Sequence, residues 1–410
     1  MDKNRSQNKK NRVVITGVGM TCAIGKNISE VTESLIHGNG GIRRITLFDS
    51  EKLHTDLFGE LQDDIVYRER DFAKPSRVET IIDKLISQML EDSGITLQEI
   101  ENLNQRAMLS MATSVGSNTH VIEYVNDIAE NKYIPERLAH FPNYLLREFQ
   151  NRLKIAGPYF VNTSACSAGT TAICTAFSRI RNGKSDLSVV VGVDPATEFS
   201  TYGFNSMKNM NKEICKPFDK MRSGINIGEG GGIMLLESLE HAIARHAKIY
   251  GEIMGYGIGN DAYHRTSPDP SGEGAYRSMK MALQDAELQA SDISYVNAHG
   301  TGTQLNDAME INAMEKIFAN VGSKPAVNST KDLTGHCLAA AGMVEAIICA
   351  LAIKEQKAWG NNHLDQPEKT KSFYLINKPF EERDIRYAMS NSFAFAGHSA
   401  SVILGKYDNN

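Results

Sequence analysis

The chain has 410 residues, of which 41% are hydrophobic and 23% are charged, and its formal net charge is -5. This composition excludes a disordered chain, and the acidic balance argues against non-specific binding to nucleic acid. The length suffices for two domains or for one large duplicated unit with a substantial core.

The cysteine pattern and the N-terminus bear on the compartment. The six cysteines are Cys22, Cys166, Cys174, Cys215, Cys337 and Cys349. They form no CxxC pair and no metal-like cluster, so neither a disulfide scaffold nor a zinc site is expected, and a reducing compartment suits them. Residues 1–11 are polar and basic, and no stretch of the sequence is long and apolar enough to span a membrane. We expect a disordered tail on a cytoplasmic protein.

The first elements read from the sequence are a buried strand over 13–20 and helices over 32–36 and 77–93. Glycines follow the strand, but they lack the spacing of a dinucleotide-binding loop. The second helix has apolar residues on one face, which is typical of a core helix. A strand is predicted over 107–116, and 118–152 is interpreted as an inserted helix and loop that forms part of a cap or an interface.

Cys166 lies between a β-prone run that begins at Val161 and a predicted helix over 170–181. The N-terminus of a helix favours negative charge, so this position would favour the thiolate, which is the nucleophilic form of cysteine. The alternative is that Cys166 is only a small buried hydrophobic residue, and its immediate context does not decide between the two.

The rest of the chain alternates between strands and helices. Residues 187–193 predict a strand buried on both faces, and the glycine-rich run 228–232 indicates a tight turn or close backbone packing, because it lacks the following Lys-Ser or Lys-Thr of a phosphate loop. Strands are further predicted over 247–257, 293–297, 326–329, 386–392 and 400–406, and helices over 272–286, 305–318 and 338–355. This alternation favours an α/β sandwich.

The two halves of the sequence echo each other weakly. Val161 opens a run that leads through a short turn to the helix after Cys166, and Val327 opens a similar run that leads past His336 to the helix at 338–355. Such a pattern would fit a duplicated fold.

Two histidines lie in small, glycine-rich contexts directly after predicted strands. His299 follows the strand at 293–297, and His336 lies between the strand at 326–329 and the helix at 338–355. A lone histidine is more often structural, but strand-end loops are where α/β folds bind ligands. A cysteine with two histidines and no metal pattern indicates acyl transfer through a thioester.

With these motifs the sequence resembles the β-ketoacyl-acyl carrier protein synthases of the elongating I/II type, which belong to the thiolase-like superfamily. The resemblance extends from Val13 to Gly405. The motifs that carry it are Val13–Met20, Ala165-Cys166-Ser167, Pro217-Phe218-Asp219-Lys220, Asp261-Ala262-Tyr263-His264 with Thr266-Ser267-Pro268, the two histidine segments, and Asn391–Gly397.

The resemblance implies a duplicated five-layer αβαβα sandwich, with one half over 12–250 and the other over 251–410. It implies that Cys166 accepts an acyl chain from acyl carrier protein (ACP) as a thioester, with the N–H groups of Cys166 and Phe395 as the oxyanion hole. His299 and His336 would hold the malonyl thioester carbonyl and stabilise the enolate that decarboxylation leaves. The first half would carry the nucleophile and the cap, and the second half both histidines and a gating loop.

The resemblance also implies supporting roles. Lys331 and Glu310 would support the histidines, and Phe395 with Phe393 would gate the acyl pocket. The residues expected to bind the substrate arm are Thr301, Thr303, Thr266 and Ser267. The residues expected to meet ACP are Lys74, Arg77, Lys208 and Lys212. No cofactor is expected beyond the phosphopantetheine of ACP, and the partners would be ACP and a second copy of the chain or a ketosynthase-like chain.

The gating loop departs from the usual Gly-Phe-Gly-Gly. Ala394 and Ala396 flank Phe395, and His398 with Ser399 stands where Thr and Asn are common. An alanine at a position that needs a positive φ is costly, so we expect a stiffer or differently folded loop and a specialised synthase of a polyketide, polyene or other secondary pathway.

Two alternatives stay open at this point. The chain could be a non-condensing subunit or malonyl-ACP decarboxylase of a polyketide assembly, although an intact Cys166 argues against this. It could also be a structural partner of another synthase-like chain.

Overall fold

The computed structural model describes residues 10–62, 76–114, 116, 129–130 and 142–408. The predicted tail, except for its last two residues, and the predicted insertion up to residue 141, except for 129–130, lie outside these ranges. Within the described residues, no helix has the length and apolar character needed to cross a bilayer.

The first half of the sequence supplies a set of long strands and the helices that follow them. The strands are β1 (Val13–Cys22), β4 (Ala107–Ala112), β5 (Tyr159–Asn162), β6 (Leu187–Asp194) and β7 (Gly230–Ser238), and a small ladder joins β2 (Arg43–Arg44) to β3 (Leu57–Phe58). The helices are α1 (Ile28–His37), α2 (Arg77–Ser93), α3 (Leu97–Asn102), α5 (Pro142–Arg152), α6 (Ala168–Arg181), α7 (Glu198–Ser206) and α8 (Leu239–Ala244).

The second half repeats this arrangement. Its strands in the main sheet are β8 (Gly251–Asn260), β9 (Ile293–Asn297), β10 (Ala326–Asn328), β12 (Tyr374–Leu375), β14 (Tyr387–Phe393) and β15 (His398–Gly405). Its helices are α9 (Glu273–Ala286), α10 (Gln304–Ile317), α11 (Lys331–Thr334) and α12 (Ala341–Glu355), and a small ladder joins β11 (Lys357–Trp359) to β13 (Phe380–Glu382).

The topology of the sheet shows the duplication directly. The order of the first half is β5-β4-β6-β7-β1, and that of the second is β10-β9-β14-β15-β8, with β12 added at its edge. In both halves the first three strands are parallel and the last two pair antiparallel. The halves join where β1 pairs antiparallel with β8 over Val13–Ile15. The weak echo in the sequence therefore corresponds to a repeated fold.

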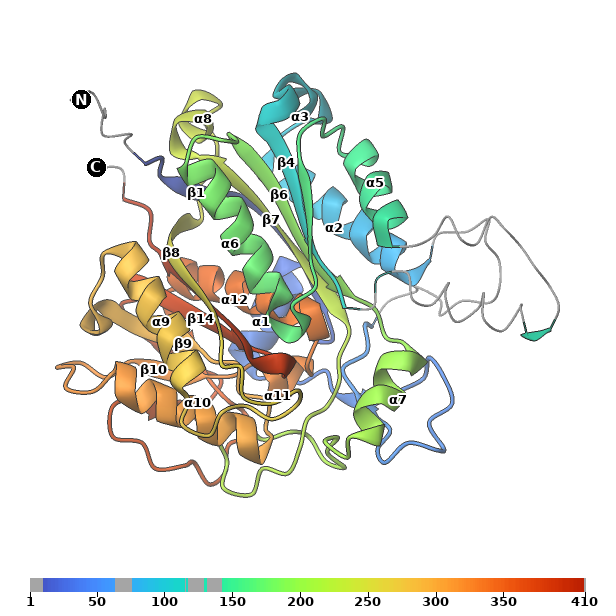
Figure 1. Ribbon diagram of the computed structural model, residues 1–410, viewed down its shortest axis with the longest axis vertical. Coiled ribbons are helices and arrows are strands. Elements are labelled where there is room, and N and C mark those ends of the chain that lie inside the picture. The colour runs from blue at the N-terminus through green and yellow to red at the C-terminus, as the bar shows by residue number, and fades with distance from the viewer. Residues whose placement is uncertain (1–9, 63–75, 115, 117–128, 131–141, 409–410) are drawn as a thin grey trace.

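The helices form three layers around the two sheet halves, as Figure 1 shows. Helix α2 packs outside the first half against β1 and β7, and α9 packs outside the second half against β8 and β15. Helices α6 and α12 lie between the halves and contact strands of both. The predicted five-layer αβαβα sandwich is confirmed. Helix α12 is buried on all sides, which explains its almost continuous run of apolar residues.

Local signals in the sequence fix the outer helices. For α2, Ser76 and Glu79 form a capping box at the N-terminus, and Gly94 ends the helix in the left-handed conformation at φ 65°. Its buried face includes Ile81, Leu85 and Met89, and it packs on the sheet. The helix predicted over 77–93 is therefore confirmed at both ends.

The two central helices begin with the same backbone geometry. Ala165 has φ 47° and Leu338 has φ 51°, and each opens a three-residue 3-10 turn that leads into α6 or α12. The second residue of each helix is glycine, at Gly169 and Gly342. A Cβ on Gly169 would lie 2.6 Å from the Met343 nitrogen, so the two helices meet where only glycine fits.

Several predicted boundaries were wrong. The strand predicted over 107–116 ends at Ala112, and the strand predicted over 247–257 runs over Gly251–Asn260. The glycines at 230–232 lie inside β7, where Gly231 and Gly232 allow Leu85 and Ile347 to approach the sheet, so close packing rather than a turn explains them. Helices α7 and α8 were not expected.

Candidate active site

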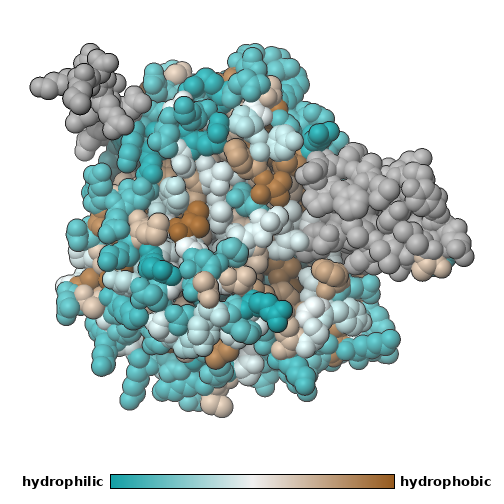
Figure 2. Space-filling view, viewed as in Figure 1, coloured by the Kyte–Doolittle hydropathy of each residue, from teal (hydrophilic) through white to brown (hydrophobic). Residues whose placement is uncertain are grey.

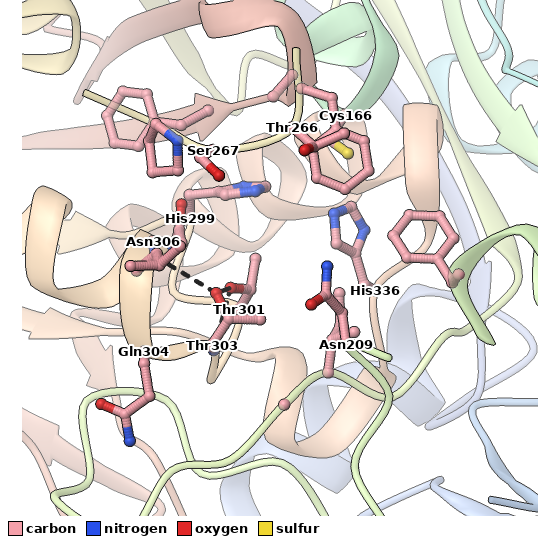
Figure 3. Close-up of a pocket in the computed structure, with 18 of the residues that line it drawn as sticks. Cys166, Asn209, Thr266, Ser267, His299, Thr301, Thr303, Gln304, Asn306 and His336 are labelled. Atoms are coloured by element: carbon pink, nitrogen blue, oxygen red, sulfur yellow. Dashed lines mark hydrogen bonds between the residues drawn. The ribbon is translucent and has the colours of Figure 1, made fainter. Parts of the chain in front are cut away.

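A cavity of about 260 Å³ lies where the ends of several parallel strands meet. Cys166 follows β5, His299 follows β9, His336 follows β10, and Phe395 follows β14. Because β4 and β5, and β9, β10 and β14, run parallel within their sheet halves, their carboxyl ends gather on the same side. All four residues line this cavity, and Figure 3 shows Cys166 and both histidines facing it.

Cys166 sits in the turn that leads into α6 and is 93% buried, since its relative exposure is 7%. Burial raises the pKa of its thiol to about 12, although the positive charge of Lys331 acts in the opposite direction. The helix N-terminus was expected to favour the thiolate, but burial outweighs the favourable charges and raises the pKa of the Cys166 thiol. The thiol is therefore protonated at neutral pH.

His336 is buried and has a defined hydrogen-bonding state. The backbone N–H of Leu338 donates to its Nδ1 at 3.0 Å, so the neutral ring carries its proton on Nε2. Burial and the charge of Lys331 hold the pKa of His336 well below its usual value, so the ring is neutral at pH 7. It offers one N–H donor to the cavity.

His299 lies beside His336, with ring centroids 5.3 Å apart and planes at 83°. Its backbone N–H donates to Glu310 at 2.8 Å, and the Lys331 ammonium approaches its Nδ1 at 3.4 Å and its carbonyl oxygen at 2.5 Å. Because an ammonium only donates, the Nδ1 of His299 accepts and its Nε2 carries the proton. Burial and Lys331 lower the pKa of His299 well below its usual value.

Two buried carboxyl groups hold this arrangement. Glu310 of α10 accepts hydrogen bonds from the N–H groups of His299 and Gly300, both at 2.8 Å. Glu345 of α12 forms an ion pair with Lys331. Burial raises the pKa of Glu310 to about 8 and that of Glu345 to about 7, and the positive charge of Lys331 acts against both increases.

Aromatic rings close the cavity beside Cys166. Phe395 stacks on Phe204 of α7, with centroids 5.7 Å apart, and Phe393 lies edge-on to His299 at 6.2 Å. Neither the Cys166 N–H nor the Phe395 N–H donates to another residue among those that the structure describes. Both amides are therefore available to an oxygen of a ligand.

The loop after β14 contains the backbone strain that its alanines suggested. Ala396 has φ 59°, a conformation that costs an L-residue about 1 kcal/mol. Gly397 has φ 73°, and a Cβ there would lie 1.9 Å from Asp261 Oδ1. The loop is tied to its neighbour because the Ala396 N–H donates to the Arg265 carbonyl at 2.7 Å.

The residues expected to hold the substrate arm line the same cavity, as Figure 3 shows. The hydroxyls of Thr301 and Thr303 lie 2.9 Å apart and hydrogen-bond each other. Thr266 and Ser267 lie on the opposite wall, where their N–H groups face the ring nitrogen of His264 at 3.2 Å each. The four polar side chains therefore line the cavity that also contains Cys166.

The expected ACP surface needs a correction. Arg77 is not on the surface: its guanidinium is 5% exposed and pairs with the fully buried Glu229, with Nε to Oε2 at 2.8 Å. It connects α2 to the interior and is not accessible to a partner. Lys208 and Lys212 are exposed, and Lys208 also lines the cavity. Lys74 lies outside the described residues.

Sequence reasoning missed residues whose role is visible only in three dimensions. Asp307 accepts N–H bonds from Phe218, Thr301 and Gly302, and Phe204 comes from the unpredicted helix α7. Glu345 could have been found, because it is the only acidic residue among the buried residues of α12. A lone carboxyl in an apolar helix needs a partner, which here is Lys331.

The described residues contain no group of three His, Cys, Asp or Glu that could hold a metal ion.

The chain matches two family models, described as the N-terminal domain of β-ketoacyl synthase over residues 10–242 and its C-terminal domain over 250–365.

Individual relatives match over nearly the whole chain. The 3-oxoacyl-[acyl-carrier-protein] synthase 2 of Staphylococcus aureus (strain COL) is 34% identical over 418 residues, covering 98% of this chain and 100% of the relative. The protein of the same name from Rhizobium meliloti (strain 1021) is 35% identical, covering 97% of this chain and 99% of the relative. Among solved structures, the ishigamide ketosynthase/chain length factor superposes with a TM-score of 0.89 at 29% identity, covering 97% of this chain and 100% of that one.

Proposed function

The chain belongs to the β-ketoacyl synthase family, and from this membership we propose that it condenses a Cys166-bound acyl chain with malonyl-ACP to give β-ketoacyl-ACP and CO₂. It is thus a carbon–carbon bond-forming acyltransferase. The observation that carries the proposal is that one cavity holds a cysteine, two neutral histidines and two unpaired backbone N–H groups.

In the first half-reaction, Cys166 attacks the thioester carbonyl of acyl-ACP. The new C–S bond forms as the bond to the phosphopantetheine sulfur breaks, and the thiol proton passes to that sulfur as it leaves. The N–H groups of Cys166 and Phe395 would stabilise the negative charge that develops on the carbonyl oxygen, because donors fixed in advance stabilise such charge most effectively.

In the second half-reaction, malonyl-ACP enters the same cavity. The Nε2–H groups of His299 and His336 donate to its thioester carbonyl, so that loss of CO₂ leaves an enolate that both histidines stabilise. The enolate carbon attacks the acyl carbonyl on Cys166, the C–S bond to the cysteine breaks, and the departing thiolate takes up a proton from water to regenerate the thiol. The neutral rings suit this task because Nδ1 of each accepts a hydrogen bond from the protein, which leaves Nε2–H as the donor to the substrate.

Lys331 and Glu310 support the histidines in this proposal. Lys331 donates toward His299 Nδ1, and Glu310 holds the backbone of the His299 loop. Thr301, Thr303, Thr266 and Ser267 would bind the phosphopantetheine arm. No further cofactor is proposed. An intact Cys166 on the cavity wall argues against a non-condensing or purely decarboxylating subunit.

We propose ACP as the first partner, as the names of the relatives suggest. Of the predicted surface, Lys208 at the cavity wall and the exposed Lys212 remain candidates for contacts with the acidic protein. The six free cysteines suit a reducing compartment, and we propose a cytoplasmic location.

A second synthase-like chain is the other proposed partner. Strand β5 is the outer strand of the first sheet half, and it exposes Tyr159 by 41% and Phe160 by 36%. An uncovered edge strand with aromatic residues favours pairing with another chain. In Figure 2 the face over α6 is paler than its teal surroundings, so its residues are less hydrophilic than those around them. We propose that two copies of the chain pair through this edge to form a homodimer. The alternative is a heterodimer with a related chain, as the name of the ishigamide ketosynthase/chain length factor suggests for that protein.

The proposed reaction is tested by intact-mass measurement of the enzyme after incubation with acyl-ACP. The wild type is expected to gain the mass of one acyl group, whereas Cys166→Ala is expected to gain none. Equal labelling of both would refute the role of Cys166. His299→Ala and His336→Ala should still become acylated but give no β-ketoacyl-ACP, because they act only on the malonyl unit. A loss of acylation as large as the loss of condensation would contradict that division.

A further inference from the structure

A buried hydrogen bond between two hydroxyl side chains joins the halves of the molecule behind the cavity. The hydroxyls of Thr170 and Ser392 lie 2.8 Å apart, and both residues are fully buried. The buried face of α6 is otherwise mostly apolar, with Ala168, Ala172 and Ile173 in the same core. A hydroxyl is not needed to fill this space, and burying one is unfavourable unless it is paired.

The two residues lie on the segments that carry the proposed oxyanion donors. Thr170 follows Cys166 by four residues, one helical turn into α6, and Ser392 precedes Phe395 by three residues at the end of β14. Cys166 comes from the first half of the sequence and Phe395 from the second. The hydrogen bond therefore connects the backbone that carries one donor to the backbone that carries the other.

The start of helix α12 packs closely against the hydrogen bond between Thr170 and Ser392. A Cβ on Gly342 would lie 2.3 Å from the Thr170 hydroxyl and 2.8 Å from the Ser392 hydroxyl. Gly342 is the second residue of α12, the helix that follows the His336 turn. With the α12 backbone this close, neither hydroxyl has room to turn toward another partner on that side.

We propose that Thr170 and Ser392 are a positioning pair that sets the separation of the Cys166 and Phe395 N–H groups. The inference rests on the proposed function, in which these two amides stabilise the oxyanion. Neither side chain lines the cavity, so the pair acts through the backbone of α6 and β14. Its effect is confined to steps at the Cys166 carbonyl and does not extend to the histidines.

The test separates the two half-reactions. Thr170→Val keeps the shape of the side chain but removes the hydroxyl, and Ser392→Ala removes the other partner. The acylation rate constant is measured by quenched intact mass with acyl-ACP over a range of concentrations. Release of CO₂ from malonyl-ACP is measured on enzyme that has first been fully acylated.

We expect each variant to lower the maximal acylation rate about tenfold, the order of loss that small misplacements of reacting groups produce, with the concentration for half-maximal rate unchanged. The rate of CO₂ release should stay within a factor of about two, since the histidines lie on other segments. Thr170→Ser, which retains the hydroxyl, should restore most of the acylation rate. The double variant should lose no more than either single one, because both remove the same bond.

A matched control is Thr175→Val on the same helix, where the hydroxyl bonds to the Thr171 carbonyl and to Asn162, away from the cavity. It should acylate at the wild-type rate. Wild-type acylation rates in Thr170→Val, or equal losses in acylation and CO₂ release, would overturn the inference. Absence of acylation in the wild type would instead overturn the proposed function.

Discussion

Cys166 shows how far a single residue's chemistry depends on distant parts of the chain. Its place after a strand and before a helix was visible in the sequence, and this place would favour a thiolate but fits a small buried hydrophobic residue equally well. In the structure, burial dominates and the pKa of the thiol rises to about 12, while Lys331, 165 positions further along by the numbering, works against this rise. Neither the degree of burial nor the position of Lys331 is encoded locally, so the candidate nucleophile could be predicted from the sequence but its protonation state could not.

The raised pKa of Cys166 predicts the pH dependence of its alkylation. Between pH 7 and pH 9 the fraction of thiolate should rise about tenfold for each pH unit, so the iodoacetamide reaction should accelerate without a plateau. Lys331→Met removes the charge that favours the thiolate and should slow the reaction further. Cys166→Ala measures the background from the other cysteines. A plateau at neutral pH in the wild type would show that the pKa is not raised.

At the scale of elements, the meeting of α6 and α12 decides the geometry of the site. Both helices were predicted, but their contact was not, because a glycine within a helical pattern gives no indication of what faces it. Gly169 and Gly342 bring the backbones together, and this places the turns that carry Cys166 and His336 around one cavity. The sequence therefore specifies the helices, whereas the distance between them follows from packing.

Gly169→Ala should destabilise the protein strongly. The added Cβ would lie 2.6 Å from the Met343 nitrogen and 2.8 Å from the Ala339 carbonyl oxygen. Both are backbone atoms, so they cannot move aside as the end of a flexible side chain could. We expect the free energy of unfolding to fall by about 1–3 kcal/mol, the range of overpacked cores, measured by urea unfolding. Gly203→Ala in α7 is the control, since nothing lies within 4 Å of the new Cβ and a helical alanine gains about 0.5–1 kcal/mol. Similar unfolding midpoints for the two variants would contradict the close contact.

At the scale of the molecule, the two halves share their core. Strands β1 and β8 pair over only Val13–Ile15, so the sheet alone joins the halves weakly. The stronger connection comes from α6 and α12, which pack on strands of both halves, and from the core cluster that includes Val13, Phe177 and Trp359. Neither half could keep its central helix buried without the other.

The shared core predicts that the molecule unfolds in one transition. Trp359 is the single tryptophan and lies buried in the second half, so its fluorescence reports on that half. Far-ultraviolet circular dichroism reports on both halves. The two urea unfolding curves should coincide. A fluorescence transition well separated from the circular dichroism transition would show that the halves unfold independently.

The sequence predicted the alternation of elements and the residues most expected to react, because strand-end loops with Cys, His and Gly stand out locally. Prediction from the sequence failed for residues whose role depends on partners that are distant in the sequence. Arg77 was expected at the surface because arginine is charged, but it is buried against Glu229, which lies 152 positions away in the sequence. Asp307 holds the site together through hydrogen bonds to Phe218 and Thr301, and no spacing in the sequence indicates them. Glu345 differs, because a lone carboxyl in an apolar helix is visible in the sequence although its partner Lys331 is not.

The turn at Leu338 has a consequence for how the chain could have arisen. It repeats the left-handed start of the Ala165 turn, so Ala339 takes the place in the second half that Cys166 takes in the first. The N–H of Ala339 donates to Asp194 at 2.7 Å and is thus satisfied within the protein. The molecule is therefore a covalent pair of related units, of which the first carries the reactive side chain and the second carries the two histidines.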